Sequence, residues 1–272
     1  MDWARAKNIL IAVLLVLNVF LTSAIIARLT GGGADRELYS GVDRILSDRG
    51  ITMLCEFPKN IKDSGQLMYG DGARYVENCA KALNGSGAKT SSVEILGRES
   101  LRYVNPSPGE GLNTESLPAL DDSIRKIFSE WGVDLTRYVT DCMESANGGG
   151  FYYRYILKIN ERLIFDSNIQ VYIDMDGGVT DIAMSYREIK PDPLETLISV
   201  IPAYQVIIRN YYVSGTAIAS IDLGYLGRNT ARENPFIESE EGAVWRVILD
   251  DGSERFFEAA YGEEVLQITP YV

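Results

Sequence analysis

The hydrophobic positions of this chain follow three patterns, which are an unbroken run, a helical spacing and an alternation typical of strands. The unbroken run comes first. Residues 9–27 carry no charge, and thirteen of these nineteen residues are Leu, Ile, Val or Phe. A helix rises about 1.5 Å per residue, so the run spans roughly 28 Å, close to a hydrocarbon core of about 30 Å. This pattern predicts a transmembrane helix over residues 9–27.

The residues before this run predict its orientation. Arg5 and Lys7 lie in the short segment 1–8, and basic residues in short flanks stay on the cytoplasmic side. Trp3 fits the belt of aromatic residues at the membrane surface. We therefore expect a cytoplasmic tail over 1–8, with Trp3, Arg5 and Lys7 as anchors at the membrane interface and the rest of the chain outside the cell.

A cleaved signal peptide is the alternative to a retained anchor. Thr22, Ser23 and Ala24 offer the small residues at which a signal peptidase cuts. The apolar run continues past them to Ala27, which makes it longer than the hydrophobic region of a usual signal peptide. The length favours a single-pass anchor, followed by a flexible linker over residues 28–34 that contains three consecutive glycines.

Helical spacing and short extended runs alternate in residues 35–112, which predicts an N-terminal α/β part of the ectodomain. Helices are expected from Asp35 to Gly50 and from Asp71 to Gly85, since each has an acidic start, an apolar stripe and a terminal glycine. Residues 51–57 and 93–104 are expected as strands.

The remaining chain predicts one kind of unit twice, over residues 113–190 and 191–272. In the first unit, a helix at 116–131 precedes strands in which apolar residues alternate, at 151–159, 163–174 and 179–186. The second unit has a helical stretch at 194–212, with a kink or break at Pro202. Its expected strands are 216–226, 244–249 and 255–261. A helix followed by an antiparallel meander, repeated, predicts an α+β fold.

Charge and cysteine content narrow the function. The whole chain has a net charge of −12, and residues 28–272 hold 24 Lys+Arg against 37 Asp+Glu, a net charge of −13. An acidic ectodomain disfavours nucleic acids and anionic surface polymers as partners. Three cysteines are too few for a disulfide scaffold. A bridge between Cys55 and Cys79 is left open, and the odd count leaves at least one free thiol.

The residues that usually carry catalysis are either absent or lack the other residues of their motifs. The chain has no histidine, which removes the commonest general base and transition-metal ligand. Ser123 and Lys126 have the spacing of penicillin-binding enzymes but lack their partner motifs. Asp174 and Asp176 lack the glycine and glutamate of a calcium-binding loop, and a hairpin accounts for both.

Adjacent carboxylates, including Asp121 with Asp122 and Glu263 with Glu264, are interpreted as solvated surface. We expect no catalytic, cofactor-binding or metal-binding residues and no cofactor. A hydrolase with two carboxylates about 5–10 Å apart in a cleft stays the minor alternative.

Asn18 and Thr22 are candidate partner-binding residues within the membrane helix. They are four residues apart and so share one helix face. An unpaired amide is costly in lipid, and a second helix can satisfy it. The other reading, of equal weight, is that Asn18 is simply tolerated while Thr22 bonds to its own helix.

The N-terminal sequence MDWARAKNILIAVLLVLNVFL resembles the start of the YycI (WalI) family, and the block FYYRYILKINERLIFDSNIQVYIDMDGG is similar to it as well. That family consists of single-pass membrane regulators of the WalK–WalR (YycG–YycF) two-component system of low-GC Gram-positive bacteria. The resemblance implies association with a YycH-like membrane protein and a WalK-like sensor histidine kinase. It also implies an influence on cell-wall metabolism and no catalytic residues.

Two function classes follow from the sequence. The first is a non-enzymatic, membrane-anchored regulator that holds a partner complex. The second is an extracytoplasmic module that binds a ligand or a wall fragment. A deep apolar pocket with converging polar groups favours the second, whereas a flat tyrosine-rich face favours the first.

Overall fold

The computed structural model covers residues 1–272 and describes residues 32–58, 61, 63–65, 67–85, 91–106, 108, 111–112, 116–145, 149–191, 197–227 and 239–265. The tail 1–8 and the apolar run 9–27 lie outside these ranges, and with them Trp3, Arg5, Lys7, Asn18 and Thr22. Within the described ranges, no helix combines the length and the apolar character needed to cross a membrane.

The fold is α+β, and its described residues include four helices. They are α2 (Gly32–Asp48), α3 (Ala73–Gly85), α4 (Leu117–Glu130) and α5 (Ala203–Arg209). The sequence predicts α4 well because its signals agree. Ser116 accepts a hydrogen bond from the Ala119 N–H at the N-terminus, and Leu120, Ile124 and Phe128 form one buried stripe. Asp71 likewise accepts the Ala73 N–H at the start of α3.

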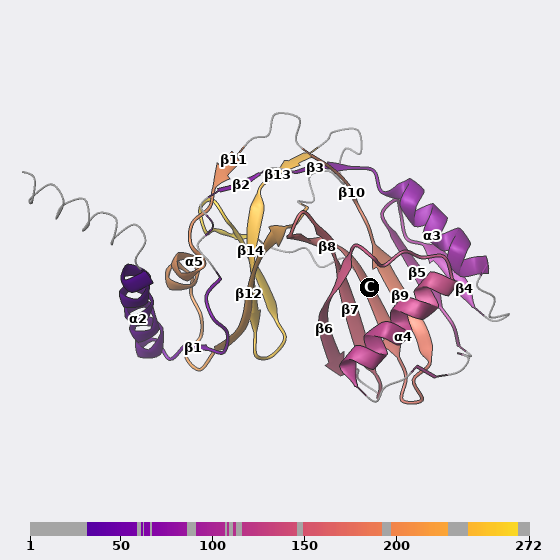
Figure 1. Ribbon diagram of the computed structural model, residues 1–272, viewed down its shortest axis with the longest axis horizontal. Coiled ribbons are helices and arrows are strands. Elements are labelled where there is room, and N and C mark those ends of the chain that lie inside the picture. Colours follow the sequence, from indigo (N-terminus) through magenta and orange to yellow (C-terminus); the bar gives the residue numbers. More distant parts are fainter. Residues whose placement is uncertain are drawn as a thin grey trace, which may run out of the picture.

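An 11-stranded mixed sheet forms the body of the molecule (Figure 1). Its main path runs through β16 (Glu264–Val265), β15 (Glu254–Glu258), β14 (Ala243–Leu249), β12 (Ala217–Tyr225), β8 (Arg162–Ile173), β9 (Val179–Ser185), β5 (Ser100–Val104) and β4 (Ser92–Ile95). Off this path, β1 (Thr52–Met53) pairs with β12, while β7 (Phe151–Ile159) pairs with both β8 and β6 (Tyr138–Ser145).

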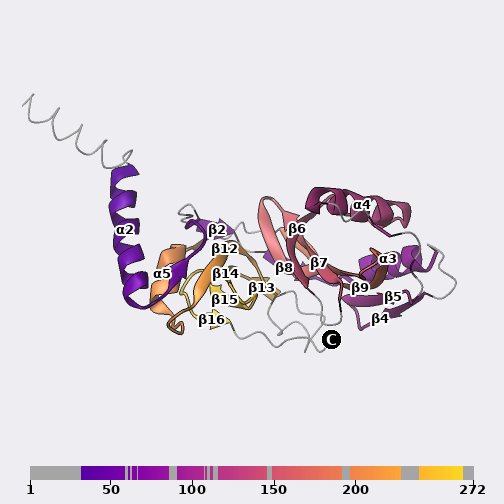
Figure 2. The ribbon, with the colours of Figure 1, turned by 90° about the horizontal axis from the view of Figure 1, so that it is seen from below.

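The sheet divides into two lobes that meet at β8 and β12. The first lobe comprises β4 to β9 with α3 and α4, and the second comprises β1, β12 and β14 to β16 with α2 and α5 (Figures 1 and 2). The lobes are joined by a short parallel pairing, in which Gly224 aligns with Leu163 and Tyr225 with Ile164. Residues before 112 contribute to both lobes, since α2 and β1 belong to the second and α3, β4 and β5 to the first.

Two small sheets lie along the upper edge in Figure 1. In one, β3 (Leu67–Gly70) pairs with both β10 (Glu188–Pro191) and β13 (Ser239–Glu241). In the other, β2 (Asp63–Gly65) pairs with β11 (Leu197–Ser199). Because β10 follows the last strand of the first lobe and β13 follows β12, strand β3 is a second connection between the lobes.

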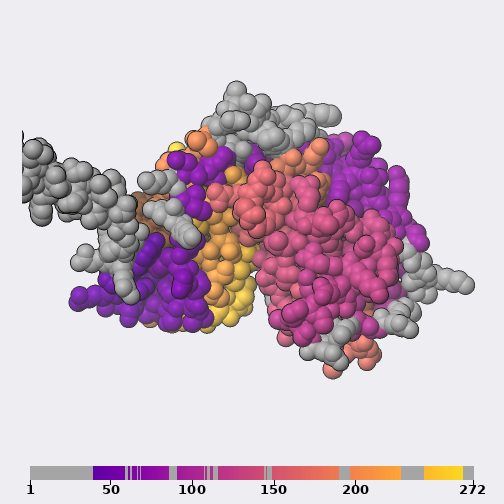
Figure 3. Space-filling model, viewed as in Figure 1, coloured from indigo at the N-terminus to yellow at the C-terminus, as the bar shows by residue number. Residues whose placement is uncertain are grey.

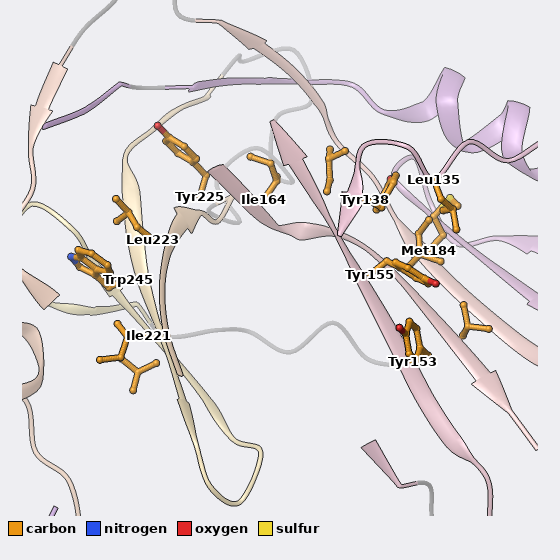
Figure 4. Packing of buried hydrophobic residues seen from close by; sticks show 14 of the residues in the cluster. Leu135, Tyr138, Tyr153, Tyr155, Ile164, Met184, Ile221, Leu223, Tyr225 and Trp245 are labelled. Atoms are coloured by element: carbon orange, nitrogen blue, oxygen red, sulfur yellow. The ribbon is translucent and has the colours of Figure 1, made fainter. Parts of the chain in front are cut away.

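One hydrophobic core extends across the joint between the lobes (Figure 4). Tyr155 on β7 and Trp245 on β14 are buried in the two lobes, and Ile164 and Tyr225 lie between them at the joint. Successive side chains of a strand point to opposite faces of the sheet, so the residues directly before and after each of these face the other way. Among the residues that the structure describes, that second face contains a separate and smaller apolar cluster, whose buried members are Ile156, Phe165, Val244 and Phe256.

Several expected elements differ from the structure. Residues 32–34 of the expected linker 28–34 belong to α2, which begins at Gly32. Each residue added to an existing helix gains a hydrogen bond, which offsets the poor helix propensity of glycine. The strand at 93–104 is a hairpin of β4 and β5, with Gly97 at φ +79° in the turn. The strand at 51–57 contracts to β1. Within the described part of the helix expected at 194–212, residues 197–199 form β11 and the helix is α5, whose first residue follows Pro202.

Candidate functional site

Charged side chains from five strands converge where the two lobes meet, on the face of the sheet opposite the main core. We call this set the inter-lobe cluster. It consists of Asp141 on β6, Arg154 on β7, Asp222 on β12, Arg246 on β14 and Glu254 on β15. The first two residues belong to the first lobe and the other three to the second, so the cluster ties the lobes together.

A β-bulge places Asp141 in the cluster. The register between β6 and β7 shifts between Thr140 and Cys142, so Asp141 has no partner across the ladder. A bulge of this kind inserts one residue and redirects its side chain. The carboxylate of Asp141 points to the second lobe and is only 5% exposed.

Arg246 is the most buried member of the cluster, with 3% of its side chain exposed. It donates to both oxygens of Asp141, from Nη2 at 2.6 Å and from Nη1 at 2.9 Å, and Nη2 also donates to Asp222 at 2.9 Å. Its guanidinium carbon lies 4.7 Å from the centre of the Phe165 ring. Burial alone would lower the pKa of Arg246, but the surrounding carboxylates outweigh it and raise the pKa.

Arg154 completes the network from the first lobe. Its Nε donates to Asp141 at 2.7 Å, and its Nη2 contacts Glu254 of the second lobe. Burial opposes its charge, but Asp141 and Glu254 dominate and raise the pKa of Arg154. Each carboxylate in the cluster is thus bound by at least one guanidinium, an arrangement that suits an ion-pair network better than proton transfer.

A second ion cluster lies close to the joint and consists of Asp166 on β8, Arg187 just after β9 and Glu99 just before β5. Arg187 donates from Nε to Glu99 at 3.0 Å and lies 3.3 Å from Asp166. The Gly227 N–H, just after β12, donates to the same carboxylate of Asp166 at 3.2 Å. Burial raises the pKa of Asp166 and outweighs the opposing effect of Arg187. This cluster also joins the two lobes, since Gly227 belongs to the second.

A hollow of about 610 Å³ lies between α2 and the segment that contains β1. Its apolar lining includes Leu46, Met53 and Phe57, and polar groups at its wall include Asp43 and Glu56. A trio of aromatic rings supports one side, with Tyr39 and Phe57 stacked at 5.7 Å and Tyr204 of α5 edge-on to both.

Some residues singled out in the sequence have structural roles in the described part of the chain. Asp174 accepts backbone N–H bonds from Asp176 and Gly178, so the hairpin interpretation of these aspartates is confirmed. Ser123 donates to the carbonyl of Ala119 on its own helix. The thiols of Cys55, Cys79 and Cys142 are not in disulfides, so the bridge between Cys55 and Cys79 is not formed.

The interpretation of Asp121 as solvated surface is wrong. Its carboxylate accepts hydrogen bonds from Arg125 at 2.8 Å, Tyr155 at 2.7 Å and Thr140 at 3.0 Å, which fastens α4 to β6 and β7. Burial would raise the pKa of Asp121, but these hydrogen bonds together lower it. Glu264 is likewise paired, because Arg255 binds both of its carboxylate oxygens.

The tyrosines divide between packing and surface. Tyr212 and Tyr225 are buried, and Tyr225 also donates to the carbonyl of Gly65. Tyr152 is exposed beside Tyr172, and Tyr211 is 80% exposed. Tyr211 and the exposed Tyr261 lie on loops in contact, since Arg209 donates to the carbonyl of Tyr261 and Asn210 to that of Gly262.

Comparison with known proteins identifies no family for this chain. No protein-family model matches it, and no curated protein matches it. Among solved structures, it is similar to an uncharacterized protein from Eubacterium rectale ATCC 33656 with 9% sequence identity and a TM-score of 0.46. The match covers 84% of this chain and 99% of the other.

Proposed function

We propose that this protein is a non-enzymatic, single-pass membrane regulator that associates with a YycH-like companion and a sensor histidine kinase. The observation that supports this proposal is the direct connection of the apolar run, through α2, to the core of the second lobe. Residues 9–27 are expected to span the membrane, and α2 begins five residues later. The buried Val42 and Leu46 of α2 belong to the core, and Arg49 donates to the carbonyl of Ile208 at the end of α5 at 2.6 Å. A displacement of the anchor would therefore act on the second lobe through α2.

The chemistry of the body agrees with a regulatory rather than a catalytic role. The sequence contains no histidine, and within the described ranges no group of His, Cys, Asp or Glu is arranged to hold a metal ion. The charged groups that converge are held in ion pairs with arginine. These observations, together with the YycI-like N-terminus, support a protein that acts through its contacts.

The proposed location is the cell membrane, with the N-terminus in the cytoplasm and the body outside. Asn18 and Thr22 are the proposed contact residues within the membrane, and Trp3, Arg5 and Lys7 the anchors at its surface. The proposed output is a change in kinase activity that adjusts cell-wall metabolism.

A pull-down from native membranes in mild detergent tests this function. Tagged full-length protein is compared with a variant that lacks residues 1–30 and carries a cleavable signal sequence for export. The proposal expects full-length protein to retain its N-terminus by intact mass and to recover a sensor kinase and a YycH-like protein, which the truncated form loses. A mature chain that starts near Ile25 and recovers no membrane protein would overturn it.

The hollow beside α2 supports a second candidate, an extracytoplasmic binding module. It combines aromatic walls with nearby carboxylates, a composition suited to a partly apolar ligand that carries a hydroxyl or amine. The probe is a muropeptide mixture from digested peptidoglycan, titrated calorimetrically into the full chain. Saturable binding that Phe57→Ala weakens tenfold or more, and Tyr152→Ala does not, would favour this function, whereas the absence of heat would remove it.

A further inference from the structure

We propose that the two lobes form a hinged pair, with the β8–β12 joint as the hinge and the ion pair between Arg246 and Asp141 as the latch of the closed arrangement. This proposal concerns a motion within the body, and it stands whether or not the partner is a kinase complex.

The path of the sheet shows how sharply the lobes are folded toward each other. From β7 to β15 the path crosses β8, β12 and β14, which makes four strand spacings. At about 4.8 Å each, these spacings would separate the outer strands by roughly 19 Å in a flat sheet. Arg154 on β7 nevertheless contacts Glu254 on β15. The sheet must therefore curl toward the face that carries the inter-lobe cluster.

The joint is the weakest part of that path. Only two Cα pairs connect β8 and β12, against seven between β12 and β14. Among the described residues, a further strand-to-strand connection is made by β3, which is four residues long and lies on the upper edge in Figure 1. Below it, Figure 3 shows a notch between the two lobes at the lower edge of this face. Short connections on one side and a side-chain cluster elsewhere are the features of a hinge with a latch.

The contacts that close the hinge are specific but not extensive. The apolar cluster on this face has only four buried residues, and small interfaces between parts of a chain permit relative motion. Buried ion pairs add little net stability, because desolvation of the charges offsets their attraction. In addition, the Nε of Arg246 is buried without a hydrogen-bond partner among the described residues. On this face the closed arrangement thus depends on Asp141, whereas the large core lies on the opposite face and crosses the joint that acts as the hinge.

The hinge is also linked to the membrane-proximal helix. After α2 the chain enters β1, in which Thr52 pairs with Ala217 and Met53 with Ile218 at the start of β12. The same strand carries Asp222 of the cluster and then Gly224 and Tyr225 of the joint. A shift of α2 along its axis would consequently reach the latch and the hinge through one strand.

Distance measurement in the full chain tests the proposal. Ketone-bearing amino acids at positions 117 and 211, which are exposed in different lobes, accept nitroxide labels without altering the three cysteines. Double electron–electron resonance in lipid nanodiscs then reports the distribution of distances between the lobes. Wild type should give one narrow peak, and Asp141→Asn should add a resolved second population. The control Glu264→Gln also removes a carboxylate bound through both oxygens to an arginine, but within one lobe, and should match wild type.

The proposal is overturned if Asp141→Asn keeps the wild-type distribution while remaining folded. Folding is checked by a cooperative unfolding transition in tryptophan fluorescence. Where Asp141→Asn does not fold, the less buried Glu254→Gln decides the question by the same readout. A second population in Glu254→Gln supports the hinge, and an unchanged single peak rejects it.

Discussion

Arg246 on β14 and Asp141 on β6 form an ion pair with two hydrogen bonds, of 2.6 and 2.9 Å, although they are 105 residues apart and belong to different lobes. The pair exists because a bulge redirects Asp141 and because the sheet curls at the β8–β12 joint. This one ion pair therefore requires both the local bulge in β6 and the overall curl of the sheet. A substitution at Asp141 consequently tests both features.

Asp141→Ala should destabilise the body by about 3 kcal/mol. Removal of one partner from a buried pair costs about 3–5 kcal/mol, and the low end applies because Arg246 keeps Asp222. The measurement is urea unfolding at pH 7, followed by fluorescence of the buried Trp245. The control Glu264→Gln breaks a more exposed pair and should cost at most about 1 kcal/mol. Equal effects of the two substitutions would contradict the assignment of Asp141.

Gly224→Ala should weaken the joint between the lobes. A Cβ at this position would lie 2.4 Å from the carbonyl oxygen of Leu163 and 2.7 Å from the ring of Phe165, so the paired strands would have to separate. Forcing an extra methyl group into a packed site costs about 1–3 kcal/mol. Gly65→Ala is the matched strand control, because nothing lies within 4 Å of its added Cβ. Urea midpoints compare the two, and a stable Gly224→Ala protein would show that the joint is loosely packed.

Asp121→Asn should make the stability of the body less dependent on acid. The folded-state pKa of Asp121 lies below its ordinary value of 3.8, so the ionised carboxylate stabilises the fold above that pH. This contribution is lost as the pH falls through the folded pKa. We expect Asp121→Asn to cost about 1–3 kcal/mol at pH 7 and progressively less below about pH 3.8. Asp122→Asn is the control, and a pH-independent difference between Asp121→Asn and wild type would contradict the assignment.

The parts of the fold that the sequence predicts are those in which several local signals agree. In α4, a capping serine, a stripe of apolar residues and a terminal glycine all indicate the same boundaries. Strands β7 and β8 are predicted by the alternation of apolar residues over most of their length and by the turn at Asn160 and Glu161. The sequence does not predict strand β6, because its polar residues obscure any alternation. It also does not predict the short strands, each of four residues or fewer, which are β2, β3, β10, β11 and β13.

The inter-lobe cluster could not be assembled from the sequence, because its five members come from strands that meet only after the sheet has curled. A partial signal existed nevertheless. Arg246 interrupts the otherwise apolar strand AVWRVIL, and Arg154 interrupts FYYRYILKI. An arginine at such a position needs a buried partner, since an isolated charge in an apolar environment is very costly. The pattern thus indicates that a carboxylate must be present, but the identity of Asp141 depends on a bulge that has no sequence signature.

Asn18→Leu should weaken the association of the full chain with its membrane partner. Asn18 is expected in the middle of the apolar run, and a hydrogen bond between membrane helices contributes about 0.6–2 kcal/mol. Loss of that bond reduces the association constant by roughly three- to thirtyfold, since 1.4 kcal/mol corresponds to a factor of ten. The measurement is recovery of the kinase and the YycH-like protein across a detergent dilution series. The control is Val16→Leu, which changes a residue on the opposite face of the expected helix, and its recovery of both proteins should equal that of wild type. Unchanged recovery with Asn18→Leu would show that the amide is tolerated in the membrane without a partner, and the search for the contact would then move to the body.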